Sequence, residues 1–307
     1  MDTLFQSAKN CLKEGLPQAK TLSVVRQIRK GIPPDNFVSL KVGLLATANV
    51  DFLAPALEVT AFSQRIKLST WTAGFNQIDQ EVLNPGSELY TFKPQLAMLY
   101  VRPEDIVSKL TYSTADVDLN QIDTWITDIR TKLLSWTENL TTAGIKVVLF
   151  SFVRPAFPPL GIGDFIHPKG QTALWRKLNE ILTDITATNT GVTIIDLEGL
   201  VRRIGLSNWV DPKLWSLAKI PGGAKFAAEF AMTIMPVINE AAGRRKKCLV
   251  LDLDNTLWGG IIGEDGVSGV KLGGDYPGNC YLEFQKSVLN LWKQGVILAI
   301  NSKNNFG

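Results

Sequence analysis

Four predominantly apolar runs, separated by amphipathic stretches, constrain the fold of this chain more than any other feature. The runs cover residues 38–46, 96–101, 146–151 and 192–196. Continuous rather than alternating apolar strands are buried on both faces, which requires a parallel sheet with helices on either side. We therefore predict an α/β fold with a doubly wound parallel sheet.

The stretches between the runs show helical spacing. We expect a helix over residues 52–65, with Asp51 as its N-cap, and one or two short helices within residues 1–36 that end at consecutive prolines. Apolar residues recur every three or four positions in two later stretches, at Ile122, Ile126, Ile129 and Leu133 and at Leu174, Leu178, Ile181 and Leu182.

A second domain is expected after a basic joint at residues 243–247. A new apolar strand at 248–251 follows the joint, and another at 295–300 comes after an amphipathic helix. The predicted organisation is a helical segment at 1–36, a doubly wound domain at 37–243 and a partial second domain at 246–307. In the alternative interpretation, residues 243–247 are only a basic segment before one more strand of the first domain.

Composition excludes several classes of function. The net charge is +3, from 32 basic and 29 acidic residues without a basic stripe, so nucleic acid is not an expected partner. No apolar stretch is long enough to cross a bilayer, and the N-terminus lacks a signal peptide, so we expect a cytoplasmic protein without a membrane partner. Three cysteines, without paired spacing, suggest neither disulfides nor a zinc site.

Polar residues follow both strands of the expected second domain. Asp252 and Asp254 stand two residues apart after the first strand, and residues 301–303, Asn-Ser-Lys, follow the second. Ligands of α/β proteins bind at the carboxyl ends of the strands. A carboxylate there can attack phosphorus, and carboxylate and carbonyl oxygens suit Mg²⁺. The alternative is an Asp- and Asn-rich turn.

The amino-acid sequence at residues 252–260, 263–266 and 302–304 resembles that of the FkbH-like branch of the haloacid-dehalogenase (HAD) superfamily. The resemblance implies the N-terminal half of a Rossmann-like HAD domain, in which Asp252 is the nucleophile and Asp254 protonates the leaving group and later activates water. The Asp252 carboxylate and the Asp254 backbone carbonyl would bind Mg²⁺. The candidate phosphate-binding residues are Thr256, which would help to hold the loop, Ser302, which would donate to the phosphoryl oxygens, Asn301 and Lys303.

The segment 45–90 resembles the SGNH-hydrolase-like domain that precedes the HAD domain in FkbH-like proteins. An esterase of that kind needs a serine after its first strand and a late histidine. Asn49 stands near the place of the serine, and the late block 211–215 has no histidine. The one histidine, His167, imitates an Asp-x-x-His pair with Asp164, although a loop position is the simpler interpretation. A binding or docking role is therefore expected for this domain.

These resemblances imply a Mg²⁺-dependent phosphatase of a small phosphorylated metabolite. By the same resemblance it would act on 1,3-bisphosphoglycerate and transfer the glyceryl group to an acyl carrier protein. Asn301 departs from several acyl-transferring relatives, which have cysteine there. Cys280 is a distant candidate for carrying the acyl group instead, but we expect it to be a small buried hydrophobe. Two alternatives stay open, namely a docking module with a vestigial HAD portion and an SGNH-type esterase.

The chain ends at Gly307, five residues after Ser302. In HAD proteins a lysine and a late acidic pair follow the second motif, and they complete the charge balance and the Mg²⁺ shell. We expect a truncated HAD portion and negligible phosphatase activity from this chain alone.

Overall fold

The computed structural model describes residues 2–112 and 114–303. The chain divides into two compact units, Met1–Gly243 and Arg244–Gly307, and each is described by itself. Within the described residues, no helix combines the length and the apolar character that crossing a membrane requires.

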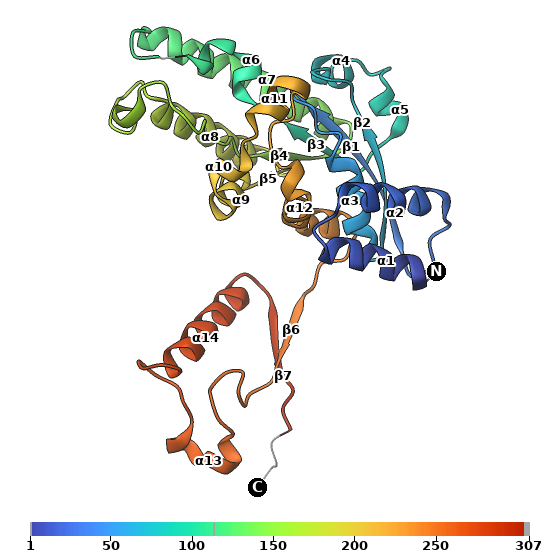
Figure 1. The fold of residues 1–307 in the computed structure, drawn as a ribbon, viewed down its shortest axis with the longest axis vertical. Helices are drawn as coiled ribbons and strands as arrows, with labels where there is room; N and C mark the ends of the chain where they lie inside the picture. The colour runs from blue at the N-terminus through green and yellow to red at the C-terminus, as the bar shows by residue number, and fades with distance from the viewer. Residues whose placement is uncertain (1, 113, 304–307) are drawn as a thin grey trace. The chain divides into compact units, whose positions relative to one another are not determined.

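The first unit is built on a parallel sheet with strand order β2-β1-β3-β4-β5 (Figure 1). This arrangement confirms the predicted α/β fold with a parallel central sheet. Four strands lie where apolar runs predicted them, and the edge strand β2 was not predicted. The strands are β1 (Val38–Ala46), β2 (Ile66–Thr72), β3 (Leu96–Tyr100), β4 (Lys146–Phe150) and β5 (Val192–Ile195).

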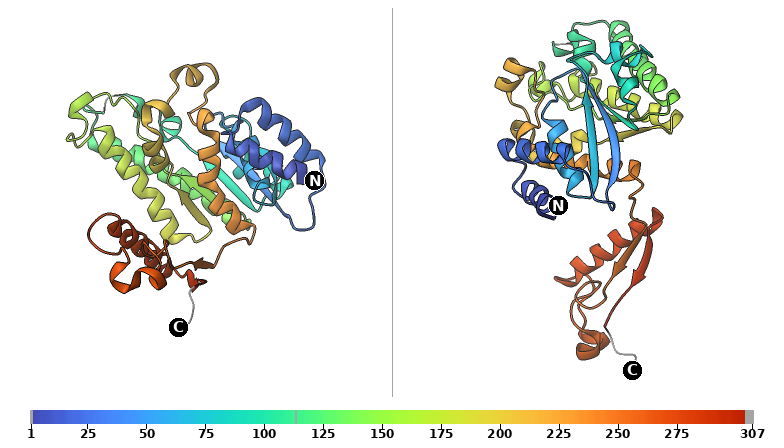
Figure 2. Two further views of the ribbon diagram at one scale, coloured as in Figure 1. Left: turned by 60° about the horizontal axis from the view of Figure 1, so that its bottom comes forward. Right: turned by 90° about the vertical axis from the view of Figure 1, so that its right-hand side faces the viewer.

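Helices cover both faces of this sheet (Figure 2). One apolar layer contains Leu96, Met98 and Tyr100 of β3, and the other contains Ala97 and Leu99. Successive side chains of a strand point to opposite faces, so each strand contributes to both layers. The first layer is completed by α1 (Asp2–Lys13), α2 (Gln18–Lys30), α3 (Leu53–Phe62), α9 (Leu197–Ile204) and α12 (Ala227–Ala241), and the second by α4 (Ile78–Val82), α5 (Glu88–Phe92), α7 (Leu119–Thr142) and α8 (Gln171–Thr188).

Short helices occupy the loops at the carboxyl ends of the strands. They are α6 (Pro103–Ile106), η1 (Ser108–Thr111), η2 (Gly161–Gly163), α10 (Leu206–Trp209), α11 (Pro212–Ala218) and η3 (Ala224–Phe226).

The start of α3 differs from the prediction. The residue before the helix is Phe52, and no side chain caps this end. Asp51 instead donates its backbone N–H to the side-chain oxygen of Asn49 at 3.0 Å. The expected Asp51 cap is therefore wrong, because the chain turns on Asn49 before the helix begins.

The second unit pairs two short parallel strands, β6 (Cys248–Leu251) and β7 (Ile297–Ile300). Between them lie α13 (Ile262–Gly269), which is interrupted at Gly266, and α14 (Gly278–Lys293). The strand expected at 295–300 begins at Ile297, because Gly295 has a φ of +91° and closes the turn after α14. Cys280 on α14 is exposed, which corrects its expected burial.

A buried carboxylate joins α2, α3 and β2 in the first unit. The side chain of Glu58 is only 1% exposed. It accepts two hydrogen bonds from the Arg29 guanidinium, at 2.8 and 2.9 Å, and one from the Thr70 hydroxyl at 2.5 Å. The side chain of Arg29 is 57% exposed, so water can solvate the cation but not the anion.

This asymmetry predicts unequal effects of removing each partner. Arg29→Met should lower the free energy of unfolding by about 3 kcal/mol, because it leaves a buried carboxylate without its cation. Glu58→Gln should cost only about 1 kcal/mol, since the amide still bonds to Thr70 and water solvates Arg29. Urea denaturation measures both values. A larger cost for Glu58→Gln than for Arg29→Met would contradict the assigned burial.

Candidate functional site

The carboxyl ends of β6 and β7 bring the predicted phosphoryl-transfer residues to one edge of the second unit. Leu251 pairs with Ile300, and the Asn301 backbone N–H donates to the Leu251 carbonyl at 2.9 Å. The next residues, Asp252 and Asn301, therefore leave the sheet side by side. These two residues are 49 positions apart in the sequence, and they meet here because the strands are parallel and in register.

Asp252 and Asp254 differ in how they are held. Asp252 is exposed, and its Oδ1 accepts a hydrogen bond from the backbone N–H of Leu253 at 2.8 Å. Asp254 is half-buried, and its Oδ1 accepts from the Trp258 indole N–H at 3.0 Å and from the Ile262 backbone N–H at 3.1 Å. Asp252 can therefore meet a ligand, whereas Asp254 has a fixed orientation.

The loop after β6 is stabilised by its own polar groups. Asn255 has a φ of +54°, and its side-chain oxygen accepts from the backbone N–H of Gly260 at 2.9 Å. Asp265 accepts from the Ile261 backbone N–H at 2.9 Å. Gly260 has a φ of +99°, which glycine adopts without strain. Half-buried Trp258 restrains Asp254 through its indole N–H.

The candidate phosphate-binding residues lie near this edge without being joined to Asp252. Thr256 and Ser302 are half-buried, whereas Asn301 and Lys303 are exposed. Across residues 248–303 no hydrogen bond links the Asp252 carboxylate to any of these four side chains. Asn304, the last residue of the second motif, lies outside the described residues. The assigned roles therefore stay predictions.

The oxygen atoms at this edge are of the chemical type that Mg²⁺ prefers as ligands. The described residues contain no group of three or more His, Cys, Asp or Glu that could hold a metal. Mg²⁺, however, commonly keeps several waters and binds one or two carboxylates together with substrate phosphate oxygens. An exposed Asp252 carboxylate and the Asp254 backbone carbonyl are donors of this type.

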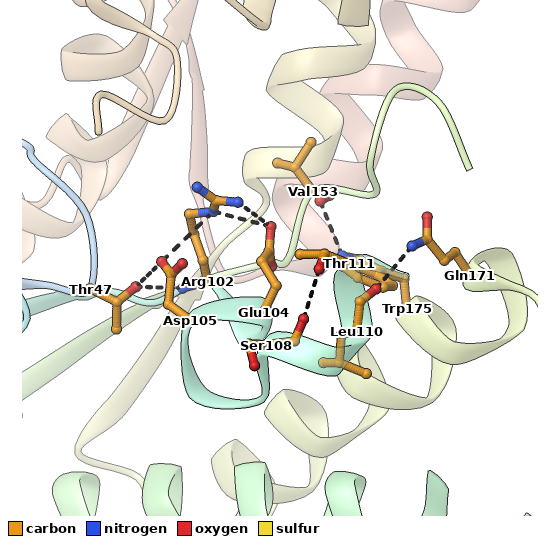
Figure 3. A network of polar contacts seen from close by, with 10 residues as sticks. All are labelled: Thr47, Arg102, Glu104, Asp105, Ser108, Leu110, Thr111, Val153, Gln171 and Trp175. Atoms are coloured by element: carbon orange, nitrogen blue, oxygen red, sulfur yellow. Dashed lines mark hydrogen bonds and ion pairs between the residues drawn. The ribbon is translucent and has the colours of Figure 1, made fainter. Parts of the chain in front are cut away.

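A second polar cluster lies in the first unit, where the order of strands reverses between β1 and β3 (Figure 3). The Thr47 hydroxyl donates to Asp105 at 2.9 Å and accepts from the Arg102 backbone N–H at 3.0 Å. Arg102 binds Glu104 at 2.5 Å and approaches Asp105 at 3.8 Å. Burial raises the pKa of Asp105, against the lowering effect of Arg102 and Thr47. Sequence reasoning missed this cluster.

The position expected for an esterase nucleophile holds no serine–histidine pair. The hydroxyl that follows β1 is that of Thr47, which is buried and bonded to a carboxylate. Asn49, two residues later, has an amide side chain and no hydroxyl. His167, the one histidine of the chain, is half-buried, and its Nδ1 accepts from the Lys169 backbone N–H at 3.2 Å.

Asp164 does not orient His167. Both of its carboxylate oxygens are engaged at the start of α8, by the backbone N–H groups of Gln171 and Thr172 and by the Thr172 hydroxyl, at 2.6 to 2.8 Å. Burial acts to raise the pKa of Asp164, but these hydrogen bonds outweigh it and the pKa lies below its ordinary value. The Asp-x-x-His spacing therefore combines two separate roles: Asp164 caps the start of α8, and His167 is a loop residue.

The fold and both strand-end clusters define a doubly wound α/β protein followed by a unit with a carboxylate motif at its strand ends. Residues 41–239 match the family described as FkbH, N-terminal domain, and the chain belongs to this family. No curated protein matches the chain.

A solved structure with a TM-score well above 0.5 supports the fold. The N-terminal part of the protein BF1531 from Bacteroides fragilis, described as containing a phosphatase domain complexed with Mg, is 24% identical, with a TM-score of 0.76 over 98% of this chain and 74% of that chain. An acetyl xylan esterase, AlAXEase, is 14% identical, with a TM-score of 0.41 over 65% and 100%. The Axe2 acetylxylan esterase of Geobacillus stearothermophilus is 11% identical, with a TM-score of 0.43 over 68% and 97%. TM-scores below 0.5 do not establish a shared fold.

Proposed function

We propose that this chain carries part of a Mg²⁺-dependent phosphoryl-transfer centre for a small phosphorylated metabolite. The observation that supports it is the contrast between exposed Asp252 and restrained Asp254 at the paired ends of β6 and β7. An exposed carboxylate suits attack on a ligand, and a fixed neighbour suits proton transfer.

The chemistry proceeds in two balanced steps. An Asp252 oxygen forms a bond to phosphorus while the bond from phosphorus to the leaving oxygen breaks, and Asp254 gives that oxygen a proton. Asp254 then takes a proton from water, whose oxygen displaces Asp252 and releases inorganic phosphate. Bound Mg²⁺ would offset the repulsion between the carboxylate and the phosphoryl oxygens.

For the substrate we propose 1,3-bisphosphoglycerate, with transfer of the glyceryl group to an acyl carrier protein. This proposal rests on the resemblance to FkbH-like proteins. Asn301 has no thiol, so an acyl group cannot be carried there as the cysteine of several relatives would allow. In this chain the carrier's own thiol would have to attack the acyl carbon at position 1 and displace the phosphate bound there, while Asp252 removes the phosphate ester at position 3.

Binding of beryllium trifluoride, a phosphoryl mimic, tests the phosphoryl-transfer proposal. Fluorine-19 NMR of the full chain in excess Mg²⁺ should show a protein-bound resonance that disappears with EDTA, because the mimic bonds to a carboxylate beside the metal. Binding rather than turnover is the readout, because attachment of the mimic to Asp252 beside the metal does not require the proton transfers of hydrolysis. A folded protein without any bound resonance would favour a docking module with a vestigial HAD portion.

The esterase alternative has less support. Within residues 2–112 and 114–303, the β1 end offers the Thr47 hydroxyl with a carboxylate partner, and His167 is held in a separate loop.

A further inference from the structure

The first unit contains a cavity that the proposed phosphoryl transfer does not use. Its volume is about 320 Å³, and it lies at the carboxyl ends of β3 and β4. Residues 100–104, 150–157 and 209–212 supply most of its lining. Ligands of doubly wound proteins bind at this end of the sheet, and cavities of this size hold small organic molecules.

Flat and aromatic groups form much of the wall. Phe150, Phe157, Trp209 and Trp215 all line the cavity. The guanidinium of Arg102 lies over the Trp215 ring at 3.7 Å from its centroid. Because Arg102 is paired with Glu104 and approaches Asp105, its charge is already neutralised, and it acts as one more flat surface.

Arg154 is the cation that this cavity leaves available. Its Nη1 donates to the Thr172 hydroxyl at 2.8 Å, and that hydroxyl donates to buried Asp164 at 2.6 Å. The guanidinium is therefore held in place through Thr172. Among the described residues no carboxylate lies within 4.0 Å of the guanidinium, although its charge acts on Asp164 through space and helps to lower the pKa of that carboxyl. One of the five N–H donors of Arg154 has a partner among the described residues.

We propose that this cavity binds a small aromatic carboxylic acid. The carboxylate accepts N–H donors from Arg154, and the ring lies against the aromatic wall near Phe157 and Trp209. One guanidinium balances one negative charge, so a carboxylate fits better than a doubly charged phosphate next to Glu104 and Asp105. This inference is independent of the proposed function of the second unit.

Calorimetric titration of the full chain with phenylacetate tests the proposal. We expect phenylacetate to bind on the order of tenfold more tightly than phenylacetamide, its neutral counterpart, because only the acid pairs with Arg154. Phenyl phosphate should also bind more weakly. Equal affinity for the acid and the amide, or no phenylacetate binding at millimolar concentration, would overturn the proposal.

Matched variants locate the site. Arg154→Gln should weaken phenylacetate binding on the order of tenfold, whereas Arg176→Gln, on the exposed surface of α8 and outside this cavity, should not. Phe157 is 86% exposed and lines the cavity, whereas Phe165 in the same loop is 75% exposed and does not. Phe157→Ser should therefore weaken binding without unfolding the protein, and Phe165→Ser should leave binding unchanged. The reverse pattern in either pair would refute the assigned location.

Discussion

Asp252→Asn should abolish the Mg²⁺-dependent binding of beryllium trifluoride. The substitution removes the oxygen that bonds to the mimic and the anionic donor for the metal in one change. Asp252 is exposed and its Oδ1 accepts only the Leu253 backbone N–H, so the amide can keep this bond and the loop should stay folded. We expect the bound fluorine resonance to vanish at all Mg²⁺ concentrations up to the millimolar range.

Two further variants separate the metal site from general effects of charge. Asp254→Asn should keep most of the binding, because an amide oxygen can still accept from Trp258 and Ile262. Asp275→Asn removes an exposed carboxylate elsewhere in the second unit and should change nothing. Unchanged binding in Asp252→Asn, or equal loss in Asp275→Asn, would remove Asp252 from the site.

Backbone amides of β6 and β7 should exchange with solvent much faster than those of β3. Every residue of β3 is buried, whereas Val250, Ile297 and Ile300 are 58%, 62% and 65% exposed. Segments with few buried apolar contacts open at low free energy. Hydrogen exchange followed by mass spectrometry should show rates in β6 and β7 higher by on the order of a hundredfold.

Ligand binding provides the internal control for this measurement. Beryllium trifluoride and Mg²⁺ together should slow exchange in β6 and β7, because a ligand that binds only the folded second unit makes its local opening less favourable. Exchange in β3 should stay unchanged. Equal protection of β3 and β7 in the free protein would show that the second unit is as stable as the first.

Apolar continuity allowed β1, β3, β4 and β5 to be predicted from sequence, because these strands are largely buried by helices on both sides. β2 was missed for the opposite reason. It is an edge strand in which Lys67 and Ser69 alternate with Ile66 and Leu68, and only three residues separate it from the end of α3. Its pattern fits one buried face, which is weaker evidence than a continuous apolar run.

The two clusters differed in how far sequence could predict them. Asp252 and Asp254 are close in the chain, so their motif was visible directly. Thr47 lies 55 residues from Arg102 and 58 from Asp105, and only the pairing of β1 with β3 brings them together. Arg154 likewise needs Thr172 and Asp164, from another part of the fold, to hold it.

The two apolar layers of the first unit have a consequence for how its sequence can vary. In β1, β3 and β4, the core residues of even number share a layer with α3 and α12, and those of odd number share a layer with α7 and α8. A change of volume at Met98 is therefore compensated most directly among the first group of helices, and one at Leu99 among the second. Covariation between positions should follow the parity of the strand residue, so that each layer can diverge while the other keeps its packing.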